Sequence, residues 1–307
     1  MIEYQVTDLS IVPLYDCNLL CDYCLFSHMR GKGRIMKISF LRHVLSLLKR
    51  ERAELESISI FGGEVTLLDV EYLKELFSSV REFFPDVYTG VVTNLIDVDD
   101  GFIRLCTDYE ISIYSSCDEF RFVEKEEKRK IWETNMKRLA DFCGEPPDCL
   151  VADSPNAEEV FAYLKELGVK RITLLRLFVP EEAPPSIRER IIRFTMPVHH
   201  MSESYYRAVR YFDEVRLPNS DGKTIINTLL LLPEGKVVIH GPSKLGYPYE
   251  KFYEIYPAGG EKSILFSEKR LEYISSFIST EPCIFCNVPV ERCLAEIRYP
   301  GLCLGHV

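Results

Sequence analysis

Three cysteines near the N-terminus form the pattern with the clearest chemical meaning in this chain. Cys17, Cys21 and Cys24 are separated by three residues and then by two, in the run Leu-Tyr-Asp-Cys-Asn-Leu-Leu-Cys-Asp-Tyr-Cys-Leu. A short loop with this spacing places three thiolates around one face of a cubane iron–sulfur cluster and leaves the fourth iron open to another ligand. A zinc site is the alternative, and it would need a fourth ligand such as His28. Structural zinc sites usually pair their cysteines in two short knuckles, so the spacing favours the cluster.

The same run resembles the cluster-binding motif of the radical S-adenosylmethionine (SAM) enzymes. Tyr23 fills the aromatic position that this family usually has before the third cysteine. The resemblance implies that the open iron chelates the amino and carboxylate groups of SAM, and that reduction of the cluster cleaves SAM to a 5′-deoxyadenosyl radical. That chemistry belongs to the cofactor, while the protein supplies binding, orientation and a dry site.

A glycine pair followed by an acid comes next. The apolar run 57–61 ends in Gly62, Gly63 and Glu64. We interpret it as a buried strand followed by a tight turn, in which missing side chains let the backbone approach a ligand. The resemblance implies that this turn holds the SAM amino group, with Glu64 as the matching acid. An ordinary strand-terminal turn is the alternative interpretation.

Two further strand-like runs end in polar residues. Thr93 and Asn94 close the first, and they match a polar pair that the family has at this place. The second ends in a run that resembles the family's "SxD" strand end, which places Ser116, with Asp118 as a further candidate, near the ribose or carboxylate of SAM. Each run alone also fits a plain strand-terminal turn, but the four segments follow one another in the family's order.

Composition limits the class of protein. The chain has 307 residues, 47% of them hydrophobic, which is enough for one large core or for a large and a small one. It has no apolar run of membrane-spanning length and no N-terminal export signal. The net charge of −10 argues against nonspecific binding to nucleic-acid phosphates. Eleven cysteines without a signal indicate metal ligation in a reducing compartment, so we expect a cytoplasmic protein.

Strand-like and helix-like segments alternate from residue 10 to about residue 178. Six such units indicate an α/β fold with a parallel sheet and right-handed crossovers, too few for a closed eight-stranded barrel. The resemblance implies the family's partial (β/α)6, TIM-like barrel, which we assign to residues 1–210. The site is expected at the carboxyl edge of the strands, where the candidate residues lie. The expected strands are 10–14, 57–61, 88–93, 111–116, 149–152 and 171–177, and the expected helices are 38–48, 70–80, 102–106, 128–142 and 157–167.

Four more cysteines lie within this pattern, in helical or strand contexts, and we interpret all four as buried thiols. They are Cys106, Cys117, Cys143 and Cys149.

The C-terminal part begins after a proline-rich break at 179–185. Two apolar runs, 224–232 and 236–240, flank a Pro-Glu-Gly turn and predict a β-hairpin. This hairpin resembles the one that opens the SPASM or twitch auxiliary-cluster domains of many radical SAM enzymes. The chain departs from that pattern because His240 stands where the first cysteine would be, and we interpret His240 as a plain hairpin residue rather than a ligand.

Four thiols follow this hairpin, and they are enough for one metal centre. They are Cys283, Cys286, Cys293 and Cys303, spaced more loosely than in the usual SPASM run. We therefore expect a small α+β metal-binding domain over residues 211–307 that holds a second 4Fe–4S cluster. Zinc remains the alternative.

The family resemblance favours a peptide or protein side chain as substrate, and it implies SAM and an electron donor as further partners. The cluster loop starts sixteen residues from Met1, so a leader-binding function is expected in a separate partner protein. A small molecule, sugar or nucleotide, including one in a nucleic-acid modification pathway, is the alternative substrate. A non-catalytic iron–sulfur or zinc scaffold is the alternative from another class of protein.

Overall fold

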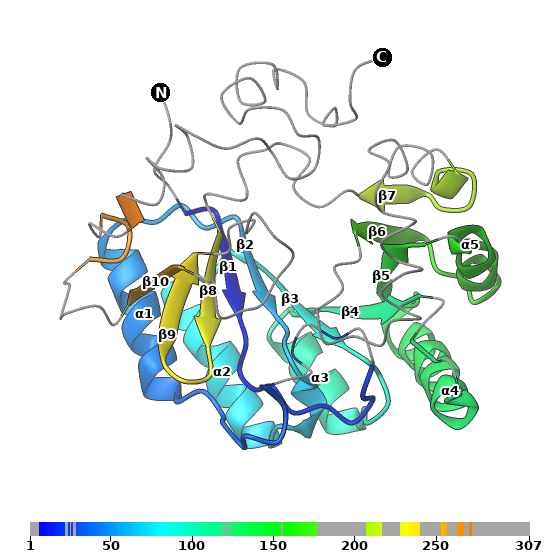
Figure 1. Cartoon of the computed structure of the whole chain (residues 1–307), viewed down its shortest axis with the longest axis horizontal. Helices are drawn as coiled ribbons and strands as arrows, with labels where there is room; N and C mark the ends of the chain where they lie inside the picture. The colour runs from blue at the N-terminus through cyan, green and yellow to red at the C-terminus, as the bar shows by residue number, and fades with distance from the viewer. Residues whose placement is uncertain are drawn as a thin grey trace, which may run out of the picture.

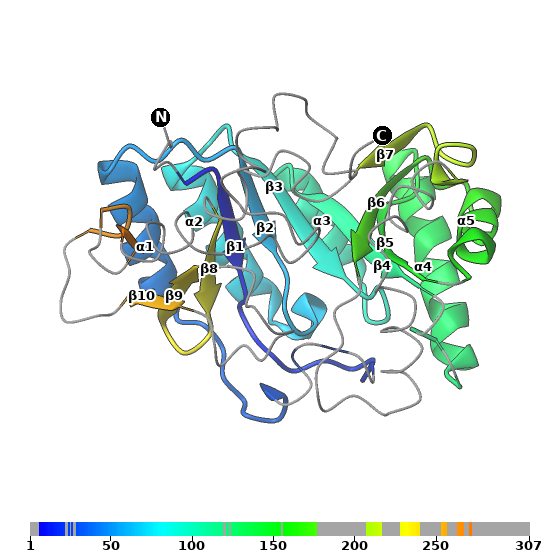
Figure 2. The same cartoon turned by 45° about the horizontal axis from the view of Figure 1, so that its top comes forward.

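The computed structural model of the chain is built on one curved sheet with helices along it (Figures 1 and 2). It describes residues 6–21, 24, 26, 29–118, 121–122, 124–154, 156–176, 207–216, 228–239, 253–256, 263–266 and 270–271. None of the helices in these ranges is long and apolar enough to cross a membrane.

The sheet contains all six expected strands in sequence order, each parallel to the next. The first strand is earlier than predicted, because Pro13 lacks the N–H that a longer ladder would need. The strands are β1 (Asp8–Ile11), β2 (Ser57–Ile60), β3 (Tyr88–Thr93), β4 (Ser112–Cys117), β5 (Asp148–Asp153) and β6 (Arg171–Arg176).

Four more strands extend the sheet at its two edges. β7 (Glu214–Arg216) is parallel to β6. At the other edge, β8 (Thr228–Leu232) is parallel to β1, and β9 (Lys236–Ile239) and β10 (Tyr253–Tyr256) continue antiparallel. The predicted hairpin is therefore confirmed over these residues, and it joins the sheet of the barrel. The assignment of residues 211–307 to a separate domain stays a prediction.

Each expected helix is present and connects two neighbouring strands. The ends differ from the predicted ones by up to three residues, because capping residues rather than the apolar pattern fix them. Asp69 and Asp99, for example, accept hydrogen bonds from the first-turn amides of Glu71 and Phe102. The helices are α1 (Ile38–Arg50), α2 (Val70–Phe83), α3 (Asp100–Asp108), α4 (Glu126–Cys143) and α5 (Ala157–Glu166).

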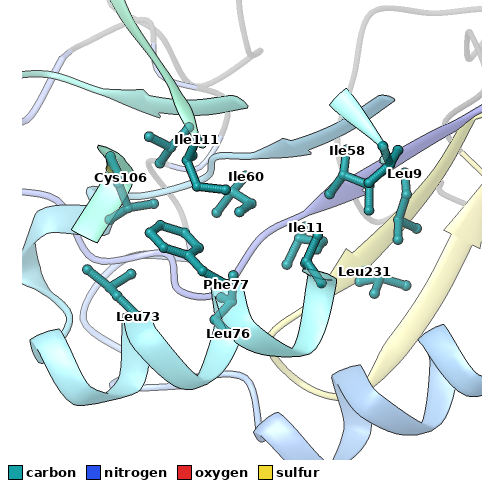
Figure 3. Packing of buried hydrophobic residues seen from close by; sticks show 14 of the residues in the cluster. Leu9, Ile11, Ile58, Ile60, Leu73, Leu76, Phe77, Cys106, Ile111 and Leu231 are labelled. Atoms are coloured by element: carbon teal, nitrogen blue, oxygen red, sulfur yellow. The ribbon is translucent and has the colours of Figure 1, made fainter. Parts of the chain in front are cut away.

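The main core lies between the sheet and these helices. Alternate residues of each strand, such as Ile11 on β1 and Ile60 on β2, are fully buried there and face Phe77 of α2 (Figure 3). The intervening residues are half-exposed, since they face the concave side of the sheet. This alternation decides which strand residues are available to a ligand. The prediction of buried thiols is confirmed for Cys106, Cys117 and Cys149, but it is wrong for Cys143, which is exposed at the end of α4.

The hairpin of β8 and β9 packs against the beginning of the three-cysteine loop. Leu230 and Val238 belong to a small apolar cluster with Val12 and Tyr15. The Tyr15 hydroxyl also donates to Glu234 in the hairpin turn, at 2.8 Å from Oε2. A residue of the C-terminal part thus holds the chain two positions before Cys17.

Candidate active site

The three-cysteine loop follows β1 at the carboxyl edge of the sheet. Cys21 is buried against Leu19, and Cys17 and Cys24 pack against the same pair. Burial raises the pKa of the Cys21 thiol, and the Arg121 guanidinium opposes that rise. The loop therefore gathers the three cysteines in one small apolar cluster with Leu19.

The arrangement is not that of a single-ion site. Among the residues that the structure describes, no three Cys, His, Asp or Glu side chains converge closely enough to hold one metal ion. In a cubane cluster each thiolate binds a different iron atom, so its ligands lie farther apart than those of one ion. The donor set and its apolar surroundings fit such a cluster. His28 and Tyr23 lie outside the described residues.

The glycine pair lies against the chain that leads into this loop. A Cβ atom on Gly63 would stand 2.1 Å from the carbonyl oxygen of Asp16, and one on Gly62 would stand 2.8 Å from that of Leu14. The Gly63 and Glu64 amides donate to these same carbonyls, Gly63 to Leu14 at 2.9 Å and Glu64 to Asp16 at 2.8 Å. The missing side chains of Gly62 and Gly63 thus make room for the backbone of residues 14–16. The sequence alone does not indicate this contact.

We expect Gly63→Ala to destabilise the protein strongly, because its Cβ meets backbone that cannot rotate away. Gly144→Ala is the matched control: Gly144 has φ +84° but open space around it, so strain alone costs about 1–2 kcal/mol. Urea unfolding of the apoproteins measures both. Equal losses of unfolding free energy would contradict the packing role of Gly63.

Glu64 is buried at the end of β2 and is fully hydrogen-bonded. Its Oε1 accepts from the hydroxyls of Thr66 at 2.8 Å and Thr93 at 2.6 Å and from the Thr66 amide at 3.1 Å. Its Oε2 accepts from the Asn94 amide at 2.7 Å. Burial raises the pKa of Glu64, and these hydrogen bonds oppose that rise. The carboxylate therefore ties the loop after β2 to the end of β3.

Asn94 connects the end of β3 to the cysteine loop. Its Nδ2 lies 2.7 Å from Oδ1 of Asn18 and 3.6 Å from Sγ of Cys17, and its Oδ1 accepts from the Ile96 amide at 2.9 Å. The Leu19 amide also points at the Cys17 sulfur, at 3.5 Å. Such N–H···S contacts are among the factors that set the reduction potential of an iron–sulfur cluster. Sequence reasoning missed Asn18, which carries no motif signal beyond its place between two cysteines.

Ser116 and Asp118 have different surroundings. Ser116 is half-exposed on the concave face of β4 and makes no hydrogen bond within the described part of the chain. Asp118 is buried and forms an ion pair with Arg121 at 3.4 Å. Ser115, the residue before Ser116, is buried; its hydroxyl donates to the Thr93 carbonyl and accepts from Trp132 Nε1. Ser116 is thus the residue of this group whose hydroxyl has no hydrogen-bond partner among the described residues.

Comparison with known proteins supports the interpretation of the loop. Residues 11–143 match the model of the radical SAM superfamily. Among solved structures, native anSMEcpe with bound AdoMet is similar to this chain, with a TM-score of 0.64 and 17% identity over 92% of this chain and 88% of that one. The complex of anSMEcpe with AdoMet and the Kp18Cys peptide gives 0.62 at the same identity and coverage. A search of curated proteins finds no match.

At this identity the solved structures establish the fold alone, an α/β arrangement with a mostly parallel sheet that fits a radical SAM partial barrel. The superfamily match covers β1 to α4, the part that contains the three-cysteine loop and the loops after β2, β3 and β4. Proteins of this superfamily use a 4Fe–4S cluster and SAM. The match therefore identifies residues 11–143 as a radical SAM segment and the protein as an enzyme.

Proposed function

We propose that Cys17, Cys21 and Cys24 bind the 4Fe–4S cluster and that the enzyme abstracts hydrogen from a peptide or protein side chain. The observation that carries the assignment is the packing of the three cysteines in one small apolar cluster, with Asn94 directed at the Cys17 sulfur. When bound, the cluster and SAM supply a 5′-deoxyadenosyl radical. The residues described above hold the loop, exclude water from it and present polar groups beside it.

The proposed SAM contacts lie on the loops that follow β2, β3 and β4. Ser116 places a half-exposed hydroxyl on the concave face with no hydrogen bond to another described residue, so a direct contact is its proposed role. Glu64 and Thr93 are already bonded to each other, so they also hold the two loops in place. The full proposed set is Tyr23, Gly62, Gly63, Glu64, Thr93, Asn94 and Ser116.

The peptide substrate is supported by the likeness of the fold to a structure that contains a peptide beside AdoMet, and by the C-terminal cysteines. We propose that Cys283, Cys286, Cys293 and Cys303 hold a second 4Fe–4S cluster, with zinc as the alternative. These four residues lie outside the described part of the chain. An electron donor and a separate leader-binding protein are proposed partners.

A small polar molecule is the second candidate substrate, and the concave face of the sheet favours it. Ser10, Ser59 and Ser112 lie in one row across neighbouring strands, on either side of Gly90. Their hydroxyls are half-exposed and make no hydrogen bond to other described residues. Such a face suits a ligand rich in hydrogen-bonding groups.

The proposal predicts that the anaerobically reconstituted protein produces 5′-deoxyadenosine from SAM, and that a true substrate raises its rate of formation. We would measure this product by chromatography with dithionite as reductant, in the presence of cysteine- and serine-containing peptides or of sugars and nucleosides. A rise with peptides alone supports the first candidate, and a rise with small molecules alone supports the second. A protein loaded with both cofactors that makes no 5′-deoxyadenosine would contradict the assignment.

A further inference from the structure

Helix α4 presents a row of hydrogen-bond donors to the loops around the three thiols. Lys128 and Asn135 are seven residues apart on the helix, and Lys125 occupies the position just before its first turn, three residues from Lys128, so the three side chains lie along one face. Trp132 on the same face donates through Nε1 to the Ser115 hydroxyl of β4, at 2.8 Å. This bond fixes the helix against the sheet. The remaining donors are aimed at backbone carbonyls rather than at other side chains.

The two lysines hold the cysteine loop. Lys125 Nζ donates to the carbonyl oxygen of Leu20 at 3.0 Å, and Lys128 Nζ donates to that of Asn18. Leu20 lies between the first and second cysteines and has φ +56°, a left-handed conformation that disfavours a leucine. Its side chain is 55% exposed, so packing of that side chain does not account for the conformation. The carbonyl bond from Lys125 stabilises it.

Asn135 holds the loop after β3 in the same way. Its Nδ2 donates to the carbonyl oxygen of Leu95 at 2.7 Å, and Leu95 has φ +57°. The preceding residue is Asn94, which bonds to Asn18 and points at the Cys17 sulfur. Both left-handed turns beside the thiols therefore have their carbonyls bound by side chains of one helix.

We infer that α4 is the positioning element of the cluster loop, and that Lys125 and Lys128 hold the loop in its binding shape before a cluster enters. The inference rests on the proposed binding of the cluster by the three thiols. Thiolates placed together repel one another, so a loop that must gather them needs bonds elsewhere to keep its shape. Two ammonium groups on the loop carbonyls supply such bonds and add positive charge beside an anionic centre.

The test is the rate at which reconstituted protein loses iron to a ferrous chelator under anaerobic conditions. We compare wild type with the double variant Lys125→Met and Lys128→Met. Outer partners of metal ligands typically contribute 10- to 100-fold to metal affinity, so iron loss should be about ten-fold faster or more. The reduced cluster should also show a changed EPR spectrum and a lower midpoint potential, because two nearby positive charges are removed.

The matched control is the double variant Lys130→Met and Lys137→Met. It makes the same chemical change on α4 at two exposed lysines whose side chains form no hydrogen bond or ion pair within the described residues. This control should lose iron at the wild-type rate. A third variant with arginine at positions 125 and 128 restores two cationic donors and should recover iron retention.

Equal iron loss and equal EPR spectra in the first double variant, its control and wild type would overturn the inference. The inference would also be overturned if this double variant lost iron faster and its apoprotein unfolded at a clearly lower temperature than wild type. The lysines would then support the fold as a whole. A wild-type protein that takes up no iron at the N-terminal thiols would instead overturn the proposed function.

Discussion

Replacing Cys17, Cys21 and Cys24 together by alanine should abolish the formation of 5′-deoxyadenosine and remove about four of roughly eight irons per chain. The physical reason is that the three cysteines pack in one small apolar cluster with Leu19, and that they are the proposed ligands of the catalytic cluster. Iron and sulfide analysis after anaerobic reconstitution, together with chromatography of the SAM products, measures both effects.

The control for this variant is Cys143→Ala, which removes an exposed thiol on α4 and should change neither iron content nor product. Continued production of 5′-deoxyadenosine by the triple variant would contradict the assignment of the catalytic cluster. If the triple variant carries zinc and no sulfide, the second-cluster proposal for the C-terminal cysteines is wrong, while the N-terminal assignment is unaffected.

Glu64→Ala should destabilise the apoprotein by roughly 2–6 kcal/mol. The substitution leaves the backbone amides of Thr66 and Asn94 without their acceptor, and each buried unsatisfied donor costs about 1–3 kcal/mol. Urea unfolding of the iron-free protein measures the loss directly. Glu54→Ala, at an exposed glutamate before β2, serves as the control and should be close to neutral. A Glu64→Ala protein as stable as wild type would contradict the hydrogen-bond network.

The variant Glu64→Gln separates this structural role from a role in SAM binding. Glutamine keeps one acceptor oxygen, so its loss of stability should be smaller and the protein can be loaded with iron. A carboxylate that also faces the SAM ammonium contributes about 1.5–3 kcal/mol, so SAM affinity measured by calorimetry should fall about ten- to a hundred-fold. Unchanged affinity with full iron loading would show that Glu64 only positions the loops.

The sequence was sufficient for the six parallel strands and five helices of the barrel, because each element has its own apolar periodicity and its own breaks. It was not sufficient for the pairing of β1 with β8, since nothing local in residues 8–11 or 228–232 indicates the partner. The hairpin itself was predictable from its Pro-Glu-Gly turn. Its place in the barrel sheet was not, because long-range pairing depends on the whole core.

The site shows the same limit at the level of single residues. The motif positions Gly62 to Glu64 were identified, but their contacts with Leu14, Asp16 and Asn94 were not. A glycine that admits backbone and a glycine that admits a ligand look alike in a sequence. The contacts of Lys128 and Asn135 with the loops could not be predicted either, because polar residues on a helix usually face solvent.

The pairing of β1 with β8 also constrains the order in which the sheet can form while the chain is synthesised at the ribosome. Residues Asp8–Ile11 are made early, yet one edge of that strand has its partner only once Leu229–Leu231 have been synthesised. Until then the nascent chain exposes an unpaired parallel edge next to the cysteine loop, and such edges attract other chains. Completion of the sheet, and the burial of Leu231 against the early strands, thus waits for the late part of translation.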